Sequence, residues 1–175
     1  MLILEDGTMA LGANSYASTA FADTYHAQFS SHNDWASADD ATKEEALIVA
    51  TRAVDQLFGD TYMSYLRPES TQALLWPRTW FTDNRGRIIV ENSIPKCLQE
   101  AVSEVAYMYF QEQEVFADVS ASANVKMTKS IVGKVDDQTI YFGPVRNERF
   151  EGFRKIELIL APILKKQPGS WRLRA

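Results

Sequence analysis

Gln72-Ala-Leu-Leu-Trp-Pro-Arg78 is the stretch that decides how this chain is divided. Trp76-Pro77 cannot lie inside a helix, because proline lacks an amide donor and restricts the residue before it. The segment 79–92, with Asn84-Arg85-Gly86 at its middle, is therefore predicted to be a turn-bearing excursion. Ser93-Ile94-Pro95 then begins a helix with proline at its first position, where the missing donor costs nothing. We interpret Trp76, Pro77 and Arg78 as structural residues that hold the linker against the body, and Pro95 as a structural helix start.

Three helices are predicted around this linker. Ser18 is a suitable N-cap for a helix over about residues 19–28. The capping box Thr42-Lys-Glu-Glu45 predicts a second helix that runs to about Phe58. The third helix runs from Pro95 to about Phe116. Apolar residues at helical spacing mark the inward faces: Phe21, Tyr25 and Phe29 for the first helix, Leu47, Ala50, Val54 and Leu57 for the second, and Leu98, Ala101, Val102, Val105, Met108 and Tyr109 for the third.

The segment between the first two helices and the C-terminal third have a different character. Residues 30–40 are polar and predicted to be a loop, with Trp35 packed back onto the core. Segments 125–132 and 139–142 favour strands and predict an antiparallel pair, which is marginal alone and needs the helices or another chain. The apolar residues of 156–164 predict a short last helix, kinked by Pro162 inside it.

The predicted fold is one mainly α domain over residues 1–175. It is a small helical bundle of three main helices with a β-hairpin-like extension and a short C-terminal helix and tail. Residues 1–118 would form the helical body, 119–145 the extension, and 146–175 the C-terminal helix and docking tail. With 46% hydrophobic residues, the chain is long enough to bury a core. No apolar run approaches the roughly 20 residues that span a bilayer, so we expect no membrane partner.

Charge divides the chain sharply. Residues 1–118 hold 7 basic and 18 acidic side chains, a balance of −11, whereas residues 119–175 hold 11 and 5, a balance of +6. Such asymmetry indicates either an oriented partner or head-to-tail self-association, although a solvated surface with uneven charge would give the same count. The single cysteine, Cys97, allows no intramolecular disulfide, which suits a reducing cytoplasm, and we expect a buried, unreactive thiol.

No catalytic constellation is evident. His26 and His32 lie six residues apart, which is not a helical metal-ligand spacing, and we expect His26 on the surface of its helix. There is no Cys/His cluster for zinc and no glycine-rich phosphate loop. The acidic pairs Asp39-Asp40 and Glu44-Glu45 flank a helix start, where negative charge is stabilising. We therefore expect no enzyme activity, no cofactor and no metal.

A series of short motifs follows in a recognisable order: Leu4-Glu-Asp-Gly7, Ala13-Asn-Ser-Tyr16, Lys43-Glu-Glu-Ala-Leu47, Ala50-Thr-Arg52, Ala73-Leu-Leu-Trp-Pro-Arg78 and Ile94-Pro95. Over about residues 1–115 they resemble a family of small tailed-phage proteins. Its members are often labelled DnaT-like single-stranded-DNA-binding proteins. Similar helical proteins encoded among head-assembly genes are head–tail connector (adaptor) proteins, which form a ring, commonly of twelve copies, beneath the portal protein. DNA passes through the centre of that ring.

The resemblance thus implies two functions, and the residues favour one of them. Binding of single-stranded DNA needs a basic groove with aromatic platforms. In this chain the aromatic residues are concentrated in the acidic part and the basic residues elsewhere. An adaptor needs a rigid helical body, an extended element that reaches a neighbour and a terminal docking segment. We therefore expect a structural virion protein of the phage neck, assembled in the host cytoplasm, with single-stranded-DNA binding as the alternative.

The expected partners are further copies in a ring of twelve, the portal protein and a downstream neck or tail-completion protein, with DNA passing through unbound. In the tail, apolar Trp171 and Leu173 alternate with Arg172 and Arg174, the composition of an interface hot spot, and the resemblance implies docking on the portal. A disordered or intramolecularly packed end is the alternative for this tail. Contact between adjacent copies is expected through the strand residues Val125, Met127, Ile131, Ile140 and Phe142.

Overall fold

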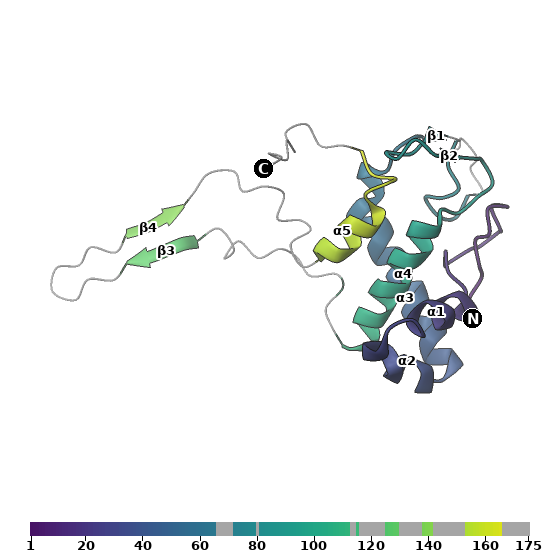
Figure 1. Ribbon diagram of the computed structural model, residues 1–175, viewed down its shortest axis with the longest axis horizontal. Helices are drawn as coiled ribbons and strands as arrows, with labels where there is room; N and C mark the ends of the chain where they lie inside the picture. The colour runs from purple at the N-terminus through teal and green to yellow at the C-terminus, as the bar shows by residue number, and fades with distance from the viewer. Residues whose placement is uncertain are drawn as a thin grey trace.

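The structure is a computed structural model that describes residues 1–65, 72–79, 81–112, 115, 125–129, 138–141 and 153–165. Within these residues the helices are α1 (Thr19–His26), α2 (Asn33–Ser37), α3 (Asp40–Phe58), α4 (Lys96–Phe110) and α5 (Arg154–Leu160). One 3-10 turn, Ser30–His32, joins α1 to α2, and another, Gly59–Thr61, follows α3. Two antiparallel pairs complete the described part, β1 (Phe81–Thr82) with β2 (Ile88–Ile89), and β3 (Val125–Lys129) with β4 (Gln138–Tyr141) (Figure 1). The predicted fold class is confirmed.

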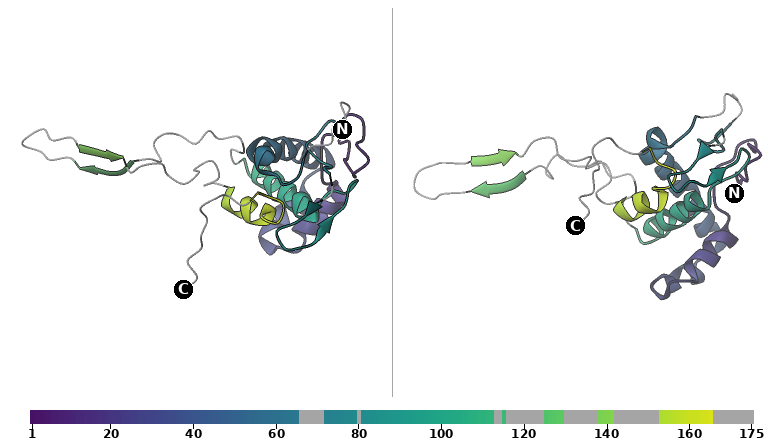
Figure 2. Two further views of the ribbon diagram at one scale, coloured as in Figure 1. Left: turned by 90° about the horizontal axis from the view of Figure 1, so that it is seen from above. Right: turned by 45° about the horizontal axis from the view of Figure 1, so that its top comes forward.

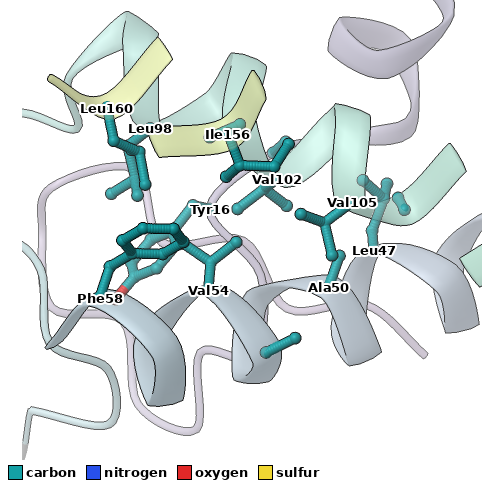
Figure 3. Packing of buried hydrophobic residues seen from close by; sticks show 14 of the residues in the cluster. Tyr16, Leu47, Ala50, Val54, Phe58, Leu98, Val102, Val105, Ile156 and Leu160 are labelled. Atoms are coloured by element: carbon teal, nitrogen blue, oxygen red, sulfur yellow. The ribbon is translucent and has the colours of Figure 1, made fainter. Parts of the chain in front are cut away.

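The core lies between α3 and α4, which run antiparallel. Figure 3 shows Phe58 beside Leu98 toward one end of the pair, and Leu47 with Val105 toward the other. Helix α5 covers the pair with Ile156 and Leu160, both buried. Burying each side chain of this size contributes about 1.5–3 kcal/mol, so periodic apolar residues fix how these helices pack. In the part that the structure describes, no helix is long and apolar enough to cross a membrane.

Helix starts differ in detail from the predicted ones. Ser18 caps α1 as predicted, since its hydroxyl accepts a hydrogen bond from the Phe21 amide. The predicted cap of α3 at Thr42 is wrong. Asp39 is the cap, and its carboxylate accepts hydrogen bonds from both the amide and the hydroxyl of Thr42, each at 2.9 Å. Because an acceptor stands three residues upstream of Thr42, α3 begins at Asp40.

The predicted loop over residues 30–40 is also wrong. This segment folds into the first 3-10 turn and α2, and it buries Trp35 as expected. The Trp35 indole N–H donates to the Asp23 carboxylate at 2.9 Å. A tertiary hydrogen bond and the burial of a large ring therefore stabilise a helical turn in a polar sequence.

The last two helices end earlier than predicted. Helix α4 ends at Phe110 and not near Phe116, because Glu112 takes a left-handed backbone conformation with φ +56°. Pro95 precedes α4 as its N-cap, in an extended conformation, and does not occupy the first helical position. Helix α5 ends at Leu160, so Pro162 follows the helix and does not kink it. A proline amide offers no donor to continue the hydrogen-bonding ladder.

The linker is fixed to α3 by a buried polar network. Trp76 is 1% exposed, and its amide donates to the Tyr16 hydroxyl at 3.1 Å. That hydroxyl donates in turn to the Asp55 carboxylate at 2.8 Å, which also accepts from the Leu75 amide at 3.3 Å. The Arg78 guanidinium donates to the Ser64 carbonyl at 3.0 Å. The Trp76-Pro77 peptide is cis. These contacts place Trp76, Pro77 and Arg78 within the packed body.

Asp55 gives this network a measurable pH dependence. Burial raises the pKa of the Asp55 carboxyl to about 6. Because the folded-state pKa lies above the unfolded value, the contribution is fully present below about pH 4 and is lost as the pH rises through about 6. We expect the wild type to lose free energy of unfolding relative to Asp55→Asn over this range, on the order of 1–3 kcal/mol. Urea unfolding of both proteins at pH 4.5 and 7 measures it, and a pH-independent difference would contradict the assignment.

The ribbon β3–β4 is antiparallel, as predicted, with Val125 opposite Tyr141, Thr128 opposite Thr139 and a register irregularity after Val125. Figures 1 and 2 draw it apart from the helices. Of the residues predicted to contact an adjacent copy, Val125, Met127 and Ile140 lie in these strands, with Met127 opposite Ile140. Ile131 and Phe142 lie outside the described residues.

Candidate functional site

The two ends of the α3–α4 pair carry the most distinctive surfaces of the described chain. Helix α4 has 15 residues and is therefore about 22 Å long. Its first turn lies beside β1–β2 and α5, and its last turn lies beside the start of α3. Figure 1 shows β1–β2 at one end of the helix pair and α2 at the other.

The β1–β2 turn is built around one buried carboxylate. Asp83 accepts hydrogen bonds from the amides of Arg85 and Arg87, each at 2.8 Å, and an ion pair with the Arg87 guanidinium at 3.0 Å. These hydrogen bonds turn the chain back on itself and hold the pKa of Asp83 below its usual value, against the effect of burial. The turn therefore presents two exposed arginine side chains, with their nearest acid withdrawn from solvent.

Apolar side chains extend from the same turn. Ile88 is 67% exposed and Val90 is 58% exposed. We call Arg85, Arg87, Ile88 and Val90 the basic tip. Behind it, a groove of about 500 Å³ separates β1–β2 from the start of α4 and from α5, where Leu158 is also exposed. Cys97 lines this groove, and burial raises the pKa of its thiol to about 11, so the thiol stays protonated at neutral pH.

The opposite end of the helix pair is acidic. Thr42, Glu45 and Ala46 of α3 meet Tyr109, Phe110 and Glu112 around a depression of about 400 Å³, which we call the acidic hollow. The Tyr109 hydroxyl donates to Glu45 at 3.0 Å, which raises the pKa of Tyr109. The two rings are half-buried and form its apolar wall, whereas Glu45 and Glu112 are exposed at its rim.

Other charges reinforce the acidity of this end. Asp34, Asp39 and Asp40 are exposed around the starts of α2 and α3. Lys43, the basic residue within this sequence neighbourhood, is buried and forms an ion pair with Asp23 at 3.0 Å. Because the Lys43 charge is buried in this ion pair, it does not neutralise the exposed carboxylates at this end.

A histidine pair lies between α1, the first 3-10 turn and α4. The prediction that His26 lies on the surface is wrong, since it is 2% exposed and its Nδ1 lies 2.9 Å from Nδ1 of His32. At that distance one nitrogen donates to the other. His32 stacks on Tyr107 at 4.0 Å between ring centroids, and Trp35 lies 4.7 Å from His26. In the described part of the chain, no three potential ligands from His, Cys, Asp and Glu gather as a metal site.

The family described as "Putative DnaT-like ssDNA binding protein" matches residues 1–175. The chain belongs to this family. No curated protein and no solved structure matches the sequence. Membership therefore extends the resemblance of residues 1–115 over the C-terminal segment as well.

The predicted site residues of this DnaT-like family member fall into three groups, of which the first, Val125, Met127 and Ile140, lies in the β3–β4 ribbon. Trp76, Pro77 and Arg78 lie in the body, and Pro95 caps α4. The tail residues Trp171, Arg172, Leu173 and Arg174, like Ile131 and Phe142 of the extension, lie outside the described residues. Neither the basic tip nor the acidic hollow was predicted as a site. The Asn84-Arg85-Gly86 turn with Ile88 beyond it was the sequence signal for the tip.

Proposed function

We propose that this family member is a non-catalytic structural adaptor of a tailed-phage neck. It would assemble with further copies, twelve in a ring, on the portal protein and below it contact a neck or tail-completion protein. DNA would pass through the ring without being bound. The protein would thus act in the virion neck after assembly in the host cytoplasm.

The observation that carries this proposal is how the body uses its aromatic residues. Tyr16, Trp35, Phe58, Tyr62 and Trp76 are all buried. Among the body residues whose burial the structure describes, the exposed aromatic side chains are Tyr65 and Phe29. Phe29 packs on Tyr25 and lies below the Lys155 ammonium, 5.7 Å from it. Stacking platforms of the kind that single-stranded DNA requires are therefore scarce on this body.

Electrostatics supports the same conclusion. The body, residues 1–118, has a charge balance of −11. An acidic wall repels a phosphate backbone, which suits a channel that must conduct DNA without retaining it. The β3–β4 ribbon supplies an extended element of the kind that pairs with a neighbouring chain.

Single-stranded-DNA binding is the second candidate, and the family description favours it. The basic balance of +6 over residues 119–175 would supply the phosphate contacts. On this alternative, affinity for oligonucleotide would fall steeply with salt, because each neutralised phosphate releases counterions.

A filter-binding assay and an electron-microscopy experiment distinguish the two candidate functions. We expect the purified protein to show no retention of a single-stranded oligonucleotide on filters, even at low salt, and to decorate isolated portal rings seen by electron microscopy. Tight oligonucleotide binding with a steep salt slope, together with bare portal rings, would establish the second candidate in its place.

Deleting residues 170–175 tests the tail within the same experiment. We expect the truncated protein to keep its far-ultraviolet circular dichroism and its unfolding midpoint, and to lose attachment to portal rings. Arg172→Ala with Arg174→Ala is a milder variant, expected to weaken attachment without abolishing it, because Trp171 and Leu173 remain. Unchanged attachment by the truncated chain would remove the tail from the docking site.

A further inference from the structure

We infer that the basic tip of one copy docks into the acidic hollow of the next copy, so that the protein associates head to tail. This inference rests on the proposed function, because a ring requires a repeated contact between copies. It goes beyond that function by assigning the two surfaces that meet.

The first argument is position. The tip precedes the first turn of α4, and the hollow is formed around its last turn, about 22 Å away. A rigid helix in the core keeps them apart, so the tip of a molecule cannot reach its own hollow. Two different surfaces at opposite ends give a heterologous contact, which repeats from copy to copy and closes into a ring when the rotation permits.

The second argument is charge. Arg85 projects from the tip with an exposed side chain, and the exposed Arg87 guanidinium pairs on one side with Asp83, which is 4% exposed. Glu45 and Glu112 stand at the rim of the hollow, and Glu45 keeps one carboxylate oxygen beyond the one that accepts from Tyr109. Arginine and carboxylate form the strongest common charge-assisted hydrogen bonds, often in pairs.

The third argument is the apolar surface. Ile88 is 67% exposed, a large exposure for an isoleucine in a strand. The hollow offers the half-buried rings of Tyr109 and Phe110 beside Ala46. An exposed aliphatic side chain flanked by arginines matches a ring-lined depression flanked by carboxylates. Glu91 follows β2 and is exposed, and Arg87 pairs with Asp83, so the positive charge of the tip is centred on Arg85.

Charge reversal on each side tests this contact in the purified full-length protein, with neither portal nor DNA present. Sedimentation equilibrium should show a weight-average mass that rises with concentration past the dimer and falls as salt is added. Arg85→Glu and Glu112→Lys should each weaken association about tenfold or more. Combining both reversals should restore it, because the sign is exchanged on both surfaces.

The variants are chosen to keep the fold. Arg85 contributes its amide and not its side chain to the turn, and a lysine at position 112 follows the C-terminus of α4, where positive charge is favourable. Arg52→Glu, at an exposed position of α3, is the matched control and should associate as the wild type does.

The result that overturns the inference is equally direct. The inference is wrong if the wild type stays monomeric up to its solubility limit, or if its association stops at a dimer. Single reversals that associate normally, or a double reversal as weak as the single ones, would also overturn it. Failure to attach to portal rings would count against the proposed function and leave these masses unaffected, so the two failures are distinguishable.

Discussion

Trp76→Ala is expected to lower the free energy of unfolding by about 3–5 kcal/mol, the range for removing a large aromatic side chain from a core. Trp76 is fully enclosed, with the Tyr62 ring edge-on at 5.7 Å and the Phe81 ring at 5.9 Å. Its removal leaves a cavity and loosens the linker whose amides donate to Tyr16 and Asp55. The total free energy of unfolding of a domain is about 5–15 kcal/mol, so this loss is a large share of its stability.

Urea denaturation followed by circular dichroism measures the loss, and two variants calibrate it. Trp76→Phe should cost clearly less than Trp76→Ala, because it keeps a six-membered aromatic ring in the cavity and removes an indole N–H that has no acceptor among the described residues. Tyr65→Ala, at an 82% exposed position, should change stability by no more than about 0.5 kcal/mol. If Trp76→Ala were as mild as Tyr65→Ala, the linker would not be part of the packed body.

How much the sequence could predict depended on whether a feature is local. The buried faces of α3 and α4 could be predicted, because apolar residues at helical spacing mark a buried face whatever that face packs against. The α2 turn was missed because Asp23, which accepts from Trp35, lies in another helix. The prediction put His26 at the surface because the residues that bury it are His32, Trp35 and Tyr107. No pattern in the sequence around His26 indicates that these rings pack against it.

The candidate site was even harder to predict from the sequence, because the fold alone brings its residues together. Asp39, Asp40, Glu44 and Glu45 were correctly interpreted as acids at a helix start. That Asp39, Asp40 and Glu45 form one acidic end with Glu112 follows from the antiparallel order of α3 and α4. The sequence divides charge between residues 1–118 and 119–175. The structure reveals a second division, inside the acidic body, where the tip is basic.

Acidification should destabilise the contact of α1 with α4 through the histidine pair. Burial, together with the neighbouring His32, lowers the pKa of His26 to about 4. Because the folded-state pKa lies below the unfolded value of 6.5, this contribution to stability is present above about pH 6.5 and is lost as the pH falls to about 4. The loss is on the order of 1–3 kcal/mol, and its sign is opposite to that of Asp55 over the same range.

Other charged groups around the pair moderate this effect and do not reverse it. Asp23 of α1 and Glu104 of α4 both favour a protonated His26. Each is already engaged, Asp23 with Lys43 at 3.0 Å and Glu104 with Lys155 at 2.6 Å. Glu104 also accepts from the Tyr25 hydroxyl at 2.6 Å. The remaining negative charge does not offset the desolvation of an imidazolium beside a second ring nitrogen 2.9 Å away.

His26→Phe keeps an aromatic ring in the cluster and removes the titrating group, so it isolates the effect. We expect the free energy of unfolding of the wild type to fall relative to this variant between pH 6.5 and 4, with no change in their difference above pH 7. Since the chain has two histidines, NMR titration of their ring protons assigns the event directly. A His26 that titrates near 6.5 in the folded protein would show that water reaches the ring, and the pH-dependent difference from His26→Phe should then vanish as well.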